Sequence, residues 1–425
     1  VWNMKFKIFQ LPFMLIILAM PIPWASSFPS LGLVTWLPEM VAIFIYLYMF
    51  SSGKFNLTFK KSHFIVVLIL FVHLVYQIVS GKGVGGGAII SVSLMSVLFF
   101  IFFKAGYLNK NYKNIISQIN VIYIIHISFI LVELILIKQG AADILLGLSN
   151  GNYKAGLPEE YALVPQSILK QSQAASMLCF FSASWFYMLY ISRKKLNVNY
   201  EIKFFIVLIS SIVLFIIYPT TTMLIVALII LFFVIYLIPF SRNLFFRLLI
   251  PVIALLFFEP VYFMVTYKLN PELYGNALLY QNSFTSPIIV FFELPLAEQL
   301  WGLGNLDHVV QAGLKAADFG AGVAVLQIGI ILGIVLILIL LSMTLQMLRF
   351  SYKKYMHNLF CFPWVWLGTV NALFVIGGLL SLVHYTPIIQ TGGRTLFSYH
   401  IAITMFSLYQ LVVYRRSLKS QGHEN

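Results

Sequence analysis

The sequence predicts an all-α, polytopic integral membrane protein with about twelve transmembrane helices. Of its 425 residues, 61% are hydrophobic and only 9% are charged, whereas ordinary soluble domains carry roughly 25% charged residues. The apolar residues form long unbroken runs such as MLIVALIILFFVIYLIPF. Strands of a membrane β-barrel would instead show short segments of alternating hydrophobicity. The basic residues supply a third observation, because they cluster in alternate connections between the runs.

Twelve apolar runs have lengths close to that needed to cross a bilayer as a helix. In chain order they are 8–24, 34–51, 64–80, 87–103, 118–137, 171–192, 204–218, 221–239, 248–266, 319–342, 359–382 and 396–413. The first run has a basic start and ends in PWASSF, which also resembles a cleavable signal peptide. We expect this run to remain as a span, because its cleavage would leave eleven spans and an amino terminus on the external side of the membrane.

The basic residues orient these spans. With a cytoplasmic amino terminus, 20 of the 27 Lys and Arg residues fall in connections on the cytoplasmic side and 7 on the other. The positive-inside rule then predicts that both termini are cytoplasmic. The net charge of +14 is therefore a sign of topology, and we expect no nucleic-acid partner.

Outside the membrane, two connections on the external face are long, 138–170 and 267–318. Long loops without a use are uncommon. The second contains SPIIVFFELPLAEQLWGLG, which is too short to span and is broken by Pro295. It predicts an interfacial or re-entrant helix, or a helix that only covers the bundle. No compositional break divides the chain, so 1–425 is expected to form one membrane domain.

Ionisable residues within the spans gather toward the external side. Charged groups in a bilayer usually face protein or a wet cavity. We therefore predict a polar cavity open to that side, formed by Glu39, Glu133, Glu259 and His400. A proton pathway would leave such groups on both sides of the midplane. His73 and His126, near the middle of their spans, are exceptions to the external placement. Each residue alone could equally serve as a hydrogen-bond partner between helices.

Three stretches carry a resemblance to a known family. They are YPTTTMLIVALIILF after the seventh span, WGLGNLDHVV followed by AADFGAGVAVLQIGIILG, and SLVHYTPIIQTGGRTLF. On a twelve-span chain with two enlarged external loops, this succession resembles the O-antigen (repeat-unit polysaccharide) polymerases of the Wzy type and, more distantly, the O-antigen ligases. Each stretch is short, and the resemblance rests largely on organisation.

The resemblance implies a GT-C-like glycosyltransferase of the bacterial inner membrane, acting on the periplasmic face. Such an enzyme transfers a growing glycan from undecaprenyl diphosphate to an incoming lipid-linked repeat unit, with inversion and without a metal. A lipid diphosphate leaving group needs cations near the outer boundary. The acceptor hydroxyl needs a general base or a polarising group. The candidates are Arg394, Lys170 and Lys154 for the diphosphate, and His384, Asp318 and His308 for catalysis.

Two departures favour a polymerase over a ligase. Ligases often carry a His near the start of the span that here follows Asp318, and an Arg in the turn where this chain has Thr220, Thr221 and Thr222. A repeat-unit flippase of the same pathway is the main alternative, but it would have short loops and cations deep in its spans. No cofactor is expected. The expected partners are undecaprenyl-diphosphate-linked oligosaccharides, membrane lipid and a chain-length regulator protein.

Overall fold

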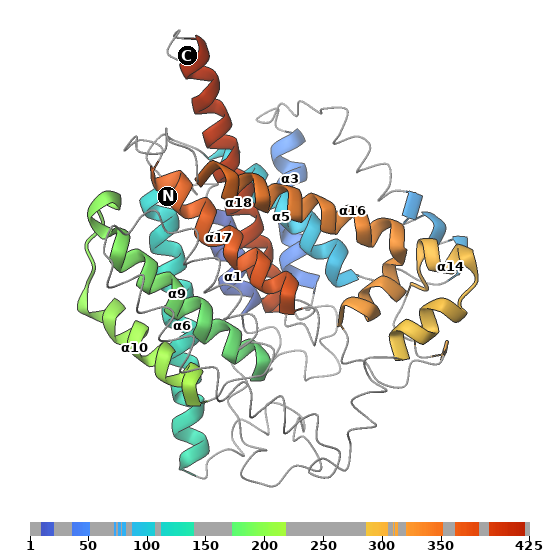
Figure 1. The fold of residues 1–425 in the computed structure, drawn as a ribbon, viewed down its shortest axis with the longest axis horizontal. Helices are drawn as coiled ribbons and strands as arrows, with labels where there is room; N and C mark the ends of the chain where they lie inside the picture. Colours follow the sequence, from blue (N-terminus) through green and yellow to red (C-terminus); the bar gives the residue numbers. More distant parts are fainter. Residues whose placement is uncertain are drawn as a thin grey trace, which may run out of the picture.

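The computed structural model describes a set of helices and the turns next to them. The described residues are 10–20, 36–51, 72–73, 75–77, 79–81, 87–106, 112–139, 172–217, 286–304, 309, 311–312, 320–351, 362–381 and 391–420. Within these ranges every named element is a helix: α1 (Leu11–Ala19), α3 (Leu37–Ser51), α5 (Gly87–Ala105), α6 (Tyr112–Lys138), α9 (Ser172–Leu196), α10 (Ile202–Ile217), α14 (Leu296–Trp301), α16 (Gly320–Ser351), α17 (Phe362–Ser381) and α18 (Thr391–Ser420) (Figure 1). The predicted all-α class is thus confirmed for the described part of the chain.

Five of these helices, α6, α9, α16, α17 and α18, are long and apolar enough to cross a membrane. Helices α3, α5 and α10 are apolar and shorter, and they coincide with predicted spans. The predicted spans 221–239 and 248–266 lie outside the described residues. The membrane character is therefore supported, while the count of twelve stays a prediction.

Helix α17 occupies the centre of the bundle. It packs against α18, α16, α9 and α6, and 89% of its apolar window is buried, compared with 33% for α16. Aromatic rings fill the surrounding space. The rings of Phe181 and Phe374 stack with centroids 4.5 Å apart, and those of Trp185 and Trp366 lie 5.0 Å apart. Such pairs favour close helix contact beyond the area that they bury.

Helices α9 and α10 form a hairpin at one side of the bundle (Figure 1). Asn197, the residue after α9, adopts a left-handed φ of 49°, which asparagine tolerates better than most residues. Its N–H donates to Lys194 O, and the N–H of Val198 donates to Arg193 O. These two bonds satisfy the last carbonyls of α9 and reverse the chain within a few residues.

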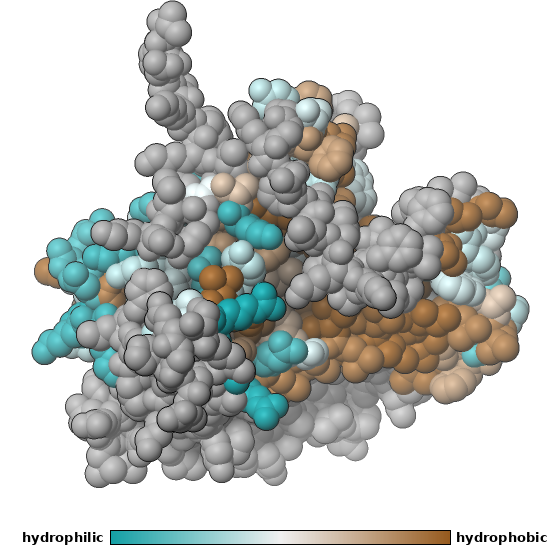
Figure 2. Space-filling model, turned by 90° about the horizontal axis from the view of Figure 1, so that it is seen from above, coloured by the Kyte–Doolittle hydropathy of each residue, from teal (hydrophilic) through white to brown (hydrophobic). Residues whose placement is uncertain are grey.

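Large apolar side chains remain exposed on the outer faces of α3, α10 and α16, for example Phe44 (74%), Phe205 (52%) and Leu338 (59%). Figure 2 shows broad hydrophobic areas on one face of the molecule. A soluble monomer rarely exposes surfaces of this kind. A lipid environment would cover them.

Helix α16 is broken at Gly329, whose φ of 75° and ψ of 164° lie outside the helical region. At the break, Leu303 N donates to Leu326 O at 2.7 Å, and Gly304 N donates to Gln327 O at 3.1 Å. The Gln77 side chain also donates to Gln327 O. Irregular backbone at membrane depth needs partners of this kind, because lipid supplies none.

The predicted interfacial or re-entrant segment provides those partners. It forms two short helices, 286–293 and α14, with the interruption at Pro295 where the sequence places it. Beyond α14, the chain at Gly302 lies directly against the break in α16. The segment is therefore packed onto a span rather than separate from the bundle.

Candidate functional site

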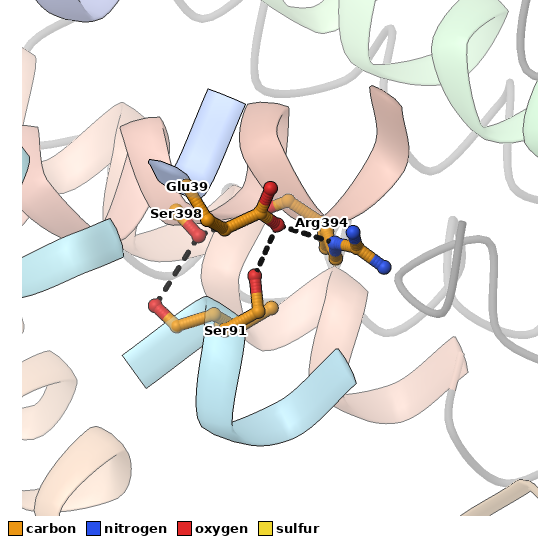
Figure 3. Close-up of polar contacts among 5 residues, drawn as sticks. Glu39, Ser91, Arg394 and Ser398 are labelled. Carbon is orange, nitrogen blue, oxygen red and sulfur yellow. Dashed lines mark hydrogen bonds and ion pairs between the residues drawn. The ribbon is translucent and has the colours of Figure 1, made fainter. Parts of the chain in front are cut away.

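A buried ion pair between Glu39 and Arg394 forms the centre of the candidate site. Arg394 Nε lies 2.7 Å from Glu39 Oε1, and the side chains of Arg394 and Glu39 are only 6% and 5% exposed. The two residues are 355 positions apart in the sequence. Figure 3 shows the carboxylate of Glu39 between the guanidinium and the hydroxyl of Ser91.

Three helices contribute to this ion pair near their amino-terminal ends. Glu39 lies in the first turn of α3, Ser91 about one turn into α5, and Arg394 in the first turn of α18. The amino end of a helix carries a partial positive charge. Glu39 is therefore favourably placed, whereas Arg394 lies against the dipole of its own helix and needs the carboxylate.

Serine hydroxyls fix the geometry. Ser91 Oγ donates to Glu39 Oε1 at 2.6 Å, so this oxygen accepts two hydrogen bonds. Ser398 Oγ lies 2.7 Å from Arg394 O and 3.2 Å from Val92 O, and thereby joins α18 to α5. The amino-terminal parts of these two helices are thus linked next to the ion pair.

Trp36, just before α3, covers the guanidinium. The Arg394 Cζ atom lies 4.5 Å from the centroid of the indole ring, a cation–π contact. Trp36 is 40% exposed, so the site lies close to the molecular surface on this side. The far end of the guanidinium points away from Glu39 (Figure 3).

The second oxygen of Glu39 is different. Glu39 Oε2 is buried and has no hydrogen-bond partner within the described structure. A buried carboxylate oxygen without a donor is costly. In Figure 3 it points to the side opposite Ser91. The pair thus offers a cation and an unused acceptor on neighbouring groups.

Among the described residues, no group of three or more His, Cys, Asp or Glu side chains could hold a metal ion. Chemically, the arrangement fits a ligand with a negative charge beside a hydrogen-bond donor. Arginine is well suited to phosphate oxygens, and the helix amino ends favour the same charge.

The structure separates His400 from this ion pair. His400 Nδ1 lies 2.6 Å from Asn371 Oδ1, and its Nε2 lies 3.2 Å from the Tyr123 hydroxyl. Both ring nitrogens therefore have partners in the core. Glu133 is also buried, on α6. Of the residues predicted to line one polar cavity, Glu39 is the one that forms the ion pair with Arg394.

Several predicted site residues lie outside the described residues. They are His384, Asp318 and His308 among the predicted catalytic groups, Lys170 and Lys154 among the predicted diphosphate ligands, and Glu259 of the predicted cavity. Their roles stay predictions.

Four residues of the hydrogen-bond and cation–π contacts around Arg394 and His400 were not predicted from the sequence. They are Ser91, Trp36, Asn371 and Tyr123. Ser91 had one usable signal, since it is a hydroxyl placed near the start of a predicted span, at the same depth as Glu39. Asn371 had another, as the only amide within its predicted span.

Comparison of the chain with protein-family models, with curated proteins and with solved structures finds no match. The class that the fold itself supports is an all-helical membrane protein with a buried Arg–Glu pair.

Proposed function

We propose that this protein is a membrane glycosyltransferase that polymerises a surface polysaccharide from lipid-linked repeat units. The observation that carries the proposal is Arg394, a cation buried at the amino ends of three helices and oriented by Glu39. A lipid diphosphate leaving group develops negative charge that such a cation stabilises. The resemblance of the sequence to the Wzy-type polymerases supplies the reaction class.

In the proposed reaction, a sugar hydroxyl of the incoming repeat unit attacks the anomeric carbon of the growing glycan. The bond from that carbon to the diphosphate oxygen breaks, with inversion, and undecaprenyl diphosphate leaves. Arg394 binds the diphosphate, and Lys170 and Lys154 of the first long loop are the further candidate ligands. His384, Asp318 or His308 takes the hydroxyl proton.

The exposed apolar faces of α3, α10 and α16 favour the proposal of a lipid-linked substrate. They would place the protein within the bilayer that holds the donor and the acceptor. The proposed location is the bacterial inner membrane, with the active face toward the periplasm and both termini in the cytoplasm. A chain-length regulator is the proposed protein partner.

Deletion of the gene tests the proposal in cells. The surface polysaccharide should then carry at most a single repeat unit. Loss of the single-repeat form as well would indicate a flippase instead, and loss of attachment with intact polymer on the lipid would indicate a ligase.

Reconstitution tests the chemistry directly. Purified protein with undecaprenyl-diphosphate-linked repeat units should form polymer, and Arg394→Ala and His384→Ala should each abolish it. If wild-type protein makes no polymer and both variants complement the deletion normally, the proposal is wrong.

A further inference from the structure

The unused oxygen of Glu39 lies at the site where the proposed function places a sugar diphosphate. Oε1 already accepts hydrogen bonds from Arg394 Nε and Ser91 Oγ, at 2.7 and 2.6 Å. Oε2 accepts none within the described structure although Glu39 is only 4% exposed. Buried polar atoms are nearly always paired, so an unpaired one needs an explanation.

Structural pairing alone does not account for this arrangement. If Glu39 only neutralised Arg394, a two-bond contact between both carboxylate oxygens and the guanidinium would be the stronger geometry. Here only Nε is engaged with Oε1, and Ser91 occupies the same oxygen. The carboxylate is thereby held with its second oxygen turned away from Ser91 (Figure 3).

From this geometry we infer that Glu39 is a substrate-binding residue, whose Oε2 accepts a hydrogen bond from a hydroxyl of the sugar attached to the lipid diphosphate at Arg394. The inference rests on the proposed function. A sugar diphosphate carries an anion and hydroxyl donors a few atoms apart, which is the chemistry that Arg394 and Glu39 together recognise. A lipid diphosphate without a sugar would contact only the arginine.

The Glu39→Gln variant distinguishes binding of the diphosphate by Arg394 from binding of the sugar hydroxyl by Glu39. The amide oxygen of glutamine can still accept from Arg394 and Ser91, whose bonds keep it on their side. The amide nitrogen then replaces Oε2 and can only donate. The hydrogen bond that the sugar hydroxyl donates to the carboxylate is lost. The charge of Arg394 is at the same time no longer offset by Glu39.

The experiment measures binding of two probes to the purified full-length chain in detergent. One probe is undecaprenyl diphosphate, and the other is undecaprenyl diphosphate carrying N-acetylglucosamine. Wild-type protein should bind the sugar-bearing lipid about tenfold more tightly or better, as expected for a hydrogen bond to a buried charge. In Glu39→Gln this ratio should fall to near one, with affinity for the sugar-free lipid unchanged or higher.

Tyr399→Phe is the matched control. It removes another buried hydrogen bond of α18, from the Tyr399 hydroxyl to Gln118 Oε1 on α6, and leaves the hydrogen-bonding groups of Glu39, Ser91 and Arg394 unchanged. It should keep the wild-type ratio even if it lowers the melting temperature. Should Glu39→Gln not fold, Glu39→Asp keeps the charge, withdraws the carboxylate by one methylene, and should reduce the ratio.

The possible results have different meanings. If wild-type protein binds both lipids equally, or if Glu39→Gln weakens both in parallel with its stability, the pair is only structural and the inference is wrong. If wild-type protein binds neither lipid, the proposed function fails together with the inference. Polymer formation by a Glu39→Gln variant that keeps the wild-type ratio would overturn the inference alone.

Discussion

Gly302 and Gly329 face each other across a contact that leaves no space for a side chain on either residue. A Cβ atom on Gly302 would lie 2.3 Å from Gln327 O, and one on Gly329 would lie 2.3 Å from Leu300 O. Both residues also have a positive φ, of 83° and 75°. The break in α16 and the chain after α14 are therefore fitted to each other through two glycines.

Gly302→Ala and Gly329→Ala should each destabilise the protein by about 3 kcal/mol or more, because strained backbone and a backbone clash add together. Thermal unfolding in detergent, followed by tryptophan fluorescence, measures the loss. Gly333→Ala is the control on the same helix, since its Cβ would meet only ordinary contacts of 3.7 Å or more. That variant should be neutral or more stable by up to about 1 kcal/mol. Equal losses at positions 329 and 333 would contradict the fitted contact.

The losses of stability from removing the two partners of the buried ion pair should not be additive. Glu39→Ala leaves the Arg394 guanidinium buried without its carboxylate, and a loss of about 3 to 5 kcal/mol is expected. The double variant Glu39→Ala, Arg394→Ala should lose less than the sum of the single losses. A double-mutant cycle by thermal or denaturant unfolding measures the difference. Additive losses would show that the two charges do not interact.

The contact between His400 and Asn371 should depend on the amide oxygen. The Asn371 amide nitrogen donates to Leu367 O, so its oxygen accepts from His400 Nδ1–H, and Nε2 accepts from the Tyr123 hydroxyl. Asn371→Ala should cost about 1 to 3 kcal/mol by leaving a buried donor unpaired. Tyr123→Phe should cost less, because it leaves only an acceptor without a partner. The reverse order in unfolding measurements would mean that the ring holds its proton on the other nitrogen.

The predicted orientation can be checked at two exposed positions. Lys138 ends α6 on the predicted external side, and Arg416 lies near the end of α18 on the predicted cytoplasmic side. In a background without the native cysteines, Lys138→Cys should react with an impermeant maleimide in intact cells. Arg416→Cys should react only after the membrane is permeabilised. Labelling of both in intact cells would overturn the positive-inside assignment.

The positions of the helices could be predicted from the sequence, but the contacts between residues of different helices could not. Long apolar runs correctly located α6, α9, α16, α17 and α18, because in lipid the backbone must satisfy its own hydrogen bonds. The helices α6, α16 and α18 extend several residues beyond the predicted runs. The break in α16 was not predicted. Glycine is common in membrane helices, and the break at Gly329 depends on a partner, Gly302, from a different segment.

The candidate site was predicted in part. Charge and depth placed Glu39 and Arg394 toward the same side of the membrane, but nothing local indicated that they form a pair. Their contact depends on the packing of α3, α5 and α18, which periodicity does not specify. Ser91 had only its depth in a predicted span as a signal, and Trp36 had none, so their contacts could be recognised only once those helices were placed.

The 355 positions between Glu39 and Arg394 also set an order of events during biosynthesis. At roughly 5 to 20 residues per second, translation takes about 20 to 70 s to pass from one to the other. During this interval the carboxylate has entered the membrane region and its arginine has not yet been made. The site therefore cannot assemble before α18 has been made, and a nascent chain that stops before α18 has helices but no completed centre.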